Sequence, residues 1–221
     1  MAFETSFKFL RGVKKNNNRE WFLKNKDLYI SAKQEFENFI DNVIKEISTF
    51  DNSISELKAK DCIYRQYRDV RFSKDKTPYK VHMGAYINSE GKKINTPGYY
   101  FHLEPGGKSI FGGGFWEPEK DLLKKVRQEI DYNLEEWESI ITEKTFKNSY
   151  PQGLSKENSL LNQPAGYDKD NPAIEYLKLK SFIVSHNFSD EQIMSNNLLK
   201  EVKKHAKALK PAIDFLKKSL H

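Results

Sequence analysis

Three residues in two neighbouring segments of the sequence have side chains that can bind metal ions or move protons. His82, His102 and Glu104 belong to two segments, "KVHMGAYIN" and "GYYFHLE", in which polar and apolar residues alternate. A period of two is typical of a β-strand with one buried face. Because adjacent strands lie about 4.8 Å apart, side chains on the same face of a sheet can converge. These three residues are therefore our catalytic candidates, and we expect them to orient a ligand or move protons.

Two tyrosines belong to the same predicted face. Tyr86 and Tyr100 alternate in step with His82 and His102, whereas the apolar residues of both segments point the other way. Such a face suits a pocket for a polar or anionic ligand, and it equally suits a structural hydrogen-bond network. Two histidines and a carboxylate also form a known metal-ligand set. Any strand with alternating polar residues supplies this spacing, so the sequence alone assigns no metal.

Positive charge is concentrated just before these strands. The formal net charge of the chain is +6, and residues 60–93 carry nearly all of the excess. We expect the pocket to bind its ligand through Tyr86, Tyr100 and the cations Arg65, Arg68, Arg71, Lys74, Lys76 and Lys80. Arginine is well suited to oxyanions because its guanidinium donates two parallel hydrogen bonds. The alternative is that Asp69 and Asp75 form ion pairs with some of these cations.

Three classes of function are compatible with the basic segment. The favoured class is a basic polar pocket for a small phosphorylated or carboxylated ligand, with or without enzymatic activity. The second is a nucleic-acid-binding module, because aromatic residues that can stack on bases interleave the cations; these are Tyr64, Tyr67, Phe72 and Tyr79. The third is a structural or protein-interaction domain whose cations only form ion pairs. The sequence identifies no cofactor, and it does not indicate an oligomeric state.

The surrounding elements predict an α+β fold. Apolar residues recur at helical spacing between residues 21 and 47, and a capping box at Ser189 opens a second long helix near the C-terminus. Between these helices, alternating segments predict strands over 62–73, 80–88, 98–104 and 108–116, with a further strand over 182–188. Short connections favour an antiparallel meander. We therefore predict one α+β domain over 1–221, with long N- and C-terminal helices and helices packed on one face of the sheet.

Two smaller features complete the expectations from the residues. The glycines at 112–114 fit a strand whose neighbours approach closely, because the residues that follow them do not match a phosphate-binding loop. Cys62 is the one cysteine, and its apolar surroundings predict a buried thiol. The start of the sequence does not resemble a signal peptide, and no apolar run approaches the ~20 residues that span a bilayer. We expect a cytoplasmic protein that does not bind membranes.

Six segments in order along the chain resemble one known family. They are "FLRGVKKNNNREWF", "RDVRFSKDKTPYK", "GYYFHLEPGG", "FGGGFWEPE", "VRQEID" and "NPAIEYLKLKSF". Together they are similar to the conserved hypothetical proteins of bacteria and fungi named domain of unknown function 2461. The resemblance covers nearly the whole chain and implies a single domain of that length. It implies no activity, cofactor or catalytic residue.

Overall fold

The first part of the chain is helical. The computed structural model describes residues 3–220. It begins with α1 (Glu4–Lys15), α2 (Arg19–Lys24), α3 (Lys26–Ser48), η1 (Asn52–Ile54) and α4 (Ala59–Cys62). The Asn18 side chain caps α2 by accepting a hydrogen bond from the backbone N–H of Trp21. The long N-terminal helix that the sequence predicts is interrupted at Asn25, between α2 and α3.

The strands form one antiparallel sheet. They are β1 (Met83–Ile87), β2 (Gly98–Leu103), β3 (Ser109–Phe115) and β4 (Phe182–Phe188), paired in the order β1-β2-β3-β4. Between β3 and β4 lie α5 (Lys120–Tyr132), α6 (Leu134–Thr142), α7 (Lys144–Ser149) and α8 (Ile174–Leu177). The chain ends with α9 (Asp190–Ile193) and α10 (Leu198–Lys218). The α+β class with an antiparallel meander is therefore confirmed.

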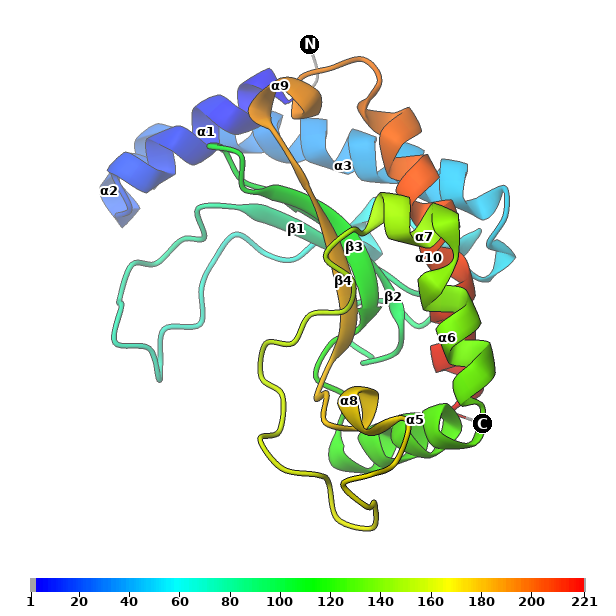
Figure 1. The fold of residues 1–221 in the computed structure, drawn as a ribbon. Helices are drawn as coiled ribbons and strands as arrows, with labels where there is room; N and C mark the ends of the chain where they lie inside the picture. The colour runs from blue at the N-terminus through cyan, green and yellow to red at the C-terminus, as the bar shows by residue number, and fades with distance from the viewer. Residues whose placement is uncertain (1–2, 221) are drawn as a thin grey trace. The chain divides into compact units, whose positions relative to one another are not determined.

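The chain divides into two compact units. The first contains residues 1–92, 100–111 and 187–203, and the second contains residues 93–99, 112–186 and 204–221. In the first unit α1 packs along α3, as Figure 1 shows, and α3 packs on β1. In the second unit the Trp137 ring of α6 lies 5.0 Å from the Phe215 ring of α10, measured between centroids. That 1–221 forms one domain stays a prediction, and residues 1, 2 and 221 lie outside the described residues.

The alternation predicted for residues 80–88 and 98–104 is confirmed within β1 and β2, whereas residues 80–82 precede β1 and Val81 is only half-buried. The buried side chains of these strands are Met83, Ala85, Ile87, Tyr99, Phe101 and Leu103. In the first unit, the Phe101 ring packs 5.0 Å from the Phe39 ring of α3. The polar residues of both strands therefore lie on the opposite face of the sheet, as the sequence predicts.

The strand predicted over residues 62–73 is wrong. Cys62 ends α4, and the following segment makes only isolated bridges between Ile63 and Ala85 and between Tyr67 and Tyr79. Pro78 interrupts the pairing because it has no N–H to donate to a ladder. Figure 1 shows residues 63–82 as a long two-armed loop leading into β1. This loop is hereafter called the basic loop.

The glycines at 112–114 allow the neighbouring strands to approach β3. A Cβ atom on Gly113 would lie 2.2 Å from the carbonyl oxygen of Gly98, and one on Gly114 would lie 1.9 Å from that of Phe182. These distances are far below van der Waals contact, so a larger residue would force the strands apart. The close-approach interpretation of the glycine run is confirmed.

Two further expectations concern burial and membranes. Cys62 is fully buried, and burial raises the pKa of its thiol to about 12. The prediction of an unreactive buried thiol agrees with this environment. No helix within residues 3–220 combines the length and the apolar composition that a bilayer crossing requires.

Candidate functional site

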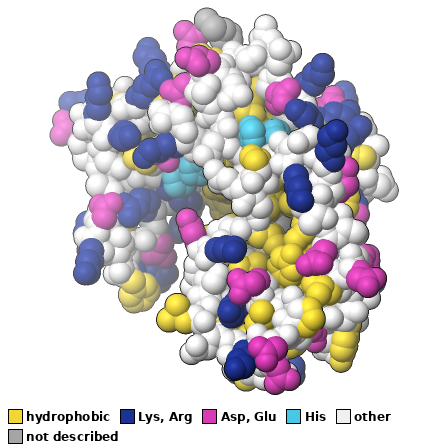
Figure 2. Space-filling view, viewed as in Figure 1, with side chains coloured by type: hydrophobic (Ala, Val, Ile, Leu, Met, Phe, Trp, Pro, Cys, Tyr) yellow, Lys and Arg dark blue, Asp and Glu magenta, His cyan; other side chains and the backbone are white. Residues whose placement is uncertain are grey.

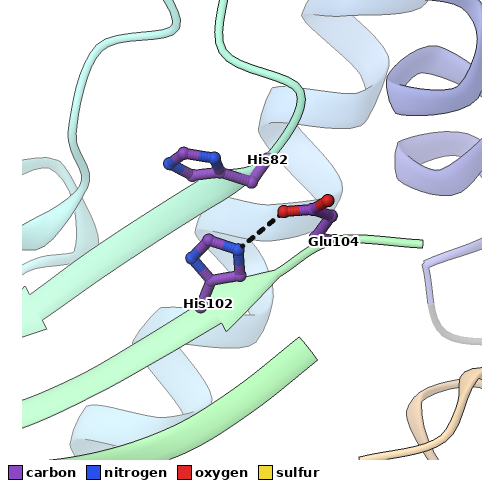
Figure 3. A group of neighbouring side chains, drawn as sticks. All are labelled: His82, His102 and Glu104. Carbon is purple, nitrogen blue, oxygen red and sulfur yellow. Dashed lines mark hydrogen bonds and ion pairs between the residues drawn. The ribbon is translucent and has the colours of Figure 1, made fainter. Parts of the chain in front are cut away.

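The structure brings His82, His102 and Glu104 together (Figure 3). His82 immediately precedes β1, His102 lies in β2, and Glu104 follows the end of β2. The two imidazole rings stack with centroids 4.3 Å apart and an angle of 27° between their planes. Nε2 of His102 lies 3.2 Å from Oε2 of Glu104. One potential ligand atom from each residue lies within 4.8 Å of the other two. These three residues are hereafter called the His–Glu group.

Tyr100 extends this group into a hydrogen-bond chain. Its hydroxyl oxygen lies 3.1 Å from Nδ1 of His102. An ionised carboxylate only accepts hydrogen bonds, so Nε2 of His102 carries the proton that Glu104 accepts. Nδ1 is then the acceptor, and the Tyr100 hydroxyl donates to it. The chain fixes both the tautomer and the orientation of the His102 ring.

Gly84 makes room for the Tyr100 ring. Both residues lie on the polar face of the sheet, in the neighbouring strands β1 and β2. A Cβ atom at position 84 would lie 2.8 Å from the Tyr100 hydroxyl oxygen and 3.3 Å from Cε2 of its ring. The phenol ring therefore occupies the space that any larger residue in β1 would need.

Burial keeps both imidazoles of the group neutral near pH 7. It lowers the pKa of His82 to about 4, and the nearby His102 and Lys80 add to this effect. Burial also lowers the pKa of His102, although its hydrogen bond with Glu104 opposes the shift. A neutral imidazole has a nitrogen lone pair, and this is the form that coordinates metal ions.

Lys80 is the predicted cation whose charge acts on this group, whereas Arg65 is exposed. Nζ of Lys80 lies 5.2 Å from the centroid of the Tyr64 ring, a cation–π contact. Burial lowers the pKa of Lys80, and the charge of Arg65 lowers it further. The charge of Lys80 in turn lowers the pKa of both His82 and His102. That Lys80 binds a ligand stays a prediction.

Two amide side chains hold the backbone that presents Lys80 and His82. Asn17 donates to the carbonyl oxygen of Tyr79 over 2.8 Å and accepts from its N–H over 3.0 Å. The buried Gln66 side chain donates to the carbonyl oxygens of both Lys80 and His82. Sequence reasoning missed both residues, because an amide that bonds to distant backbone has no local sequence pattern.

Two arginines of the basic loop, Arg68 and Arg71, form ion pairs within the loop. The guanidinium of Arg68 donates to the Asp75 carboxylate and to the Thr77 hydroxyl. That of Arg71 donates to the Asp69 carboxylate over 2.7 Å, and its side chain is 76% exposed. The ion-pair alternative from the sequence therefore describes both arginines. Their assignment as ligand-binding residues stays a prediction.

Of the other predicted ligand-binding residues, two lysines lie in the basic loop and one tyrosine lies on the polar face of the sheet. Lys74 is exposed, and Nζ of Lys76 donates to the Val70 carbonyl oxygen within the basic loop over 3.0 Å. Tyr86 is half-buried on the polar face of β1, and burial raises the pKa of its hydroxyl, with a smaller contribution from Tyr64. Tyr86 therefore belongs to the polar face, whereas the interactions of Lys76 are local to the loop.

A second close pair of histidine rings lies in the second unit. The rings of His186 in β4 and His205 in α10 have centroids 4.0 Å apart. The hydroxyl of Tyr150 donates to the His205 carbonyl oxygen over 3.0 Å. Within residues 3–220, only the first pair has a carboxylate placed to complete a three-ligand group. The sequence did not predict this second pair, because one member lies in a strand and the other in a helix.

The fold and the site define an α+β protein with a four-stranded antiparallel sheet whose polar face carries two histidines, a glutamate and a tyrosine in mutual contact. The chain belongs to the family described as conserved hypothetical protein (DUF2461), whose family model matches residues 5–215. A comparison with curated proteins and a comparison with solved structures each found no match.

Proposed function

We propose that this protein binds a small anionic ligand at a divalent transition-metal ion held by His82, His102 and Glu104. The observation that carries the proposal is the convergence of one ligand atom from each residue within 4.8 Å. Imidazole nitrogen combined with carboxylate oxygen suits zinc, iron and cobalt. Calcium and magnesium prefer sites made entirely of oxygen, so they fit this group less well.

Tyr100 has a defined role in this proposal. When a metal ion takes the place of the proton on Nε2 of His102, the remaining ring proton must lie on Nδ1. The Tyr100 hydroxyl, 3.1 Å from Nδ1, then accepts a hydrogen bond instead of donating one. Partners of this kind orient a metal-bound imidazole and increase its basicity.

Three protein ligands leave at least one coordination position for another molecule. Closed structural zinc sites use four protein ligands, whereas sites that bind and activate small molecules keep a position open. Lys80 lies beside this group and adds positive charge. An anion is therefore the ligand that the charges of the site favour.

Metal titration tests the proposal. Chelator-treated protein is titrated with Co²⁺, and the visible absorption of the bound ion is recorded. We expect one Co²⁺ per chain, and an affinity at least about tenfold lower in His102→Asn and in Glu104→Gln, since each loses a ligand. His186→Asn is the matched control, because it alters the other close histidine pair, which does not belong to the three-ligand group found within residues 3–220. Equal Co²⁺ affinity in all three variants would contradict the proposal.

One observation favours a second candidate, a nucleic-acid-binding module. The Phe72 side chain is 95% exposed within the basic loop and lies 5.7 Å from the Arg71 guanidinium carbon. Against it, Lys or Arg and Asp or Glu side chains are interspersed on the face seen in Figure 2. Fluorescence anisotropy with a labelled single-stranded oligonucleotide decides between them. Binding that weakens steeply with salt and is lost in Phe72→Ala would support the module.

A further inference from the structure

Lys80 lacks a negatively charged partner in the described part of the chain. No carboxylate of residues 3–220 forms an ion pair with its ammonium group, whereas Arg68 and Arg71 of the basic loop each have such a partner. Lys80 is half-buried, with its Nζ over the Tyr64 ring, so solvent compensates its charge only in part. Bringing a cation out of water without a partner is costly. This cost indicates that a partner from outside the chain completes the site.

A metal ion would increase the excess of positive charge. Glu104 is the one carboxylate of the His–Glu group, and its Oε1 already lies 3.7 Å from Nζ of Lys108. A divalent ion together with Lys80 therefore outweighs the single carboxylate by more than one charge. At the low effective dielectric of a half-buried site, such an imbalance attracts anions strongly. A doubly charged anion compensates it better than a singly charged one.

The chain places Lys80 close to the proposed metal site. Lys80 precedes His82 by two residues, so their Cα atoms lie within about 7 Å of each other. Gln66 holds the carbonyl oxygens of both residues, and Asn17 holds the preceding residue, Tyr79. The backbone that carries Lys80 and His82 is therefore held in place before any ligand binds.

We infer that the ligand is a small dianion, of the phosphate or dicarboxylate class, with one oxygen on the metal ion and a second on the Lys80 ammonium group. Arg65, which is exposed, contributes only a weaker positive charge near Lys80. This inference rests on the proposed metal site, and it makes Lys80 the residue that selects dianions over monoanions. The chemistry is shared by phosphate and by dicarboxylates, and the experiment separates the two.

The test uses the Co²⁺-loaded protein and three anions. Inorganic phosphate, malonate and acetate are titrated separately, with the Co²⁺ absorption and the heat of binding as readouts. We expect phosphate or malonate to bind at least about tenfold more tightly than acetate. In Lys80→Met, affinity for the preferred dianion should fall about tenfold and more than affinity for acetate, while Co²⁺ still binds. Lys33→Met, on the exposed side of α3, is the matched control and should bind all three anions as the native protein does.

The outcomes separate this inference from the proposed function. If Co²⁺ binds and Lys80→Met keeps full affinity for the dianion, the inference is overturned and the metal site stands. If acetate binds as tightly as phosphate and malonate, selection for dianions is overturned. If the native protein binds no Co²⁺, both proposals fail. Preference for malonate over phosphate would assign the ligand to the dicarboxylates, and the reverse would assign it to the phosphates.

Discussion

The hydroxyl oxygen of Tyr100 lies 3.1 Å from Nδ1 of His102, while the other ring nitrogen of His102 faces Glu104. One imidazole is therefore held from both nitrogens by residues of the same strand and its continuation. Only one ring orientation satisfies both contacts. The metal-binding nitrogen of the proposed site is thus oriented before an ion arrives, and this relationship leads to the first two predictions.

Removing the Tyr100 hydroxyl should weaken the metal site without unfolding the protein. Tyr100→Phe keeps the ring but leaves Nδ1 of His102 without its partner, and loss of such a partner typically lowers metal affinity about tenfold or more. Competition between the protein and a coloured Co²⁺ chelator measures the affinity. Tyr64→Phe is the control, because the Tyr64 hydroxyl takes no part in the chain from Glu104 to Tyr100. A purely structural Tyr100 would change the unfolding temperature and leave Co²⁺ affinity unaltered.

A methyl group at position 84 should act through Tyr100. In Gly84→Ala the new Cβ would lie 2.8 Å from the Tyr100 hydroxyl oxygen, so the phenol must move away from its place above β1. We expect Co²⁺ affinity to fall about as much as in Tyr100→Phe, because both changes disturb one contact. The double variant should then lose little more than either single one. Fully additive losses in this cycle would show that Gly84 acts independently of Tyr100.

The bidentate contact of Asn17 with Tyr79 should control the local stability of the segment before β1. Asn17→Ala removes both hydrogen bonds to the Tyr79 backbone. Leaving a buried backbone group unsatisfied costs about 1–3 kcal/mol. Hydrogen exchange at the Tyr79 amide should therefore become faster, and affinity for a dianion that depends on Lys80 should fall. Exchange as slow as in the native protein would mean that other contacts hold the segment.

Much of the polar face could be predicted from the sequence, because it follows from a period of two. Once Met83 and Phe101 are assigned to the core, His82 and His102 must lie on the other face, and short turns bring the two strands together. The pairing of His102 with Glu104 is local to one strand and its continuation, so alternation also predicts that both lie on one side.

The rest depended on contacts between distant residues. The cation spacing of the basic loop is compatible with a strand, and only the structure shows that the loop folds on itself through pairs such as Arg68 with Asp75. Asn17 and Tyr79 are separated by 62 residues, and no pattern within either segment indicates their contact. Residues 63–82 form a loop instead of a strand because of Pro78 and because of the backbone groups with which they pair. A count of β-forming side chains includes neither of these.

The buried histidine of the second unit should make the protein sensitive to acid. Burial lowers the pKa of His205 from 6.5 to about 4, and the charges of His186 and Lys204 contribute. Between these pH values the unfolded chain binds a proton that the folded chain does not, so the free energy of unfolding falls as pH falls from 6.5 toward 4. Above pH 6.5 this contribution is constant.

His205→Gln isolates that contribution. The variant lacks the titrating group, so its free energy of unfolding should depend less steeply on pH between 4 and 6.5. The difference in slope is at most about 1.4 kcal/mol per pH unit, the value for one proton. Urea unfolding of metal-free native and variant protein at several pH values measures it. Parallel curves across that window would show that His205 is already protonated in the folded state.

Burial of the one cysteine has a practical consequence for studying this protein in solution. Cys62 is inaccessible, and the pKa of its thiol is raised to about 12, so reagents that attack thiolates should modify it only when the structure opens. The rate of modification at increasing urea then reports the free energy of that opening directly. The same low background lets a cysteine placed at an exposed position, such as Phe72 of the basic loop, carry a fluorescent label without removal of the native thiol.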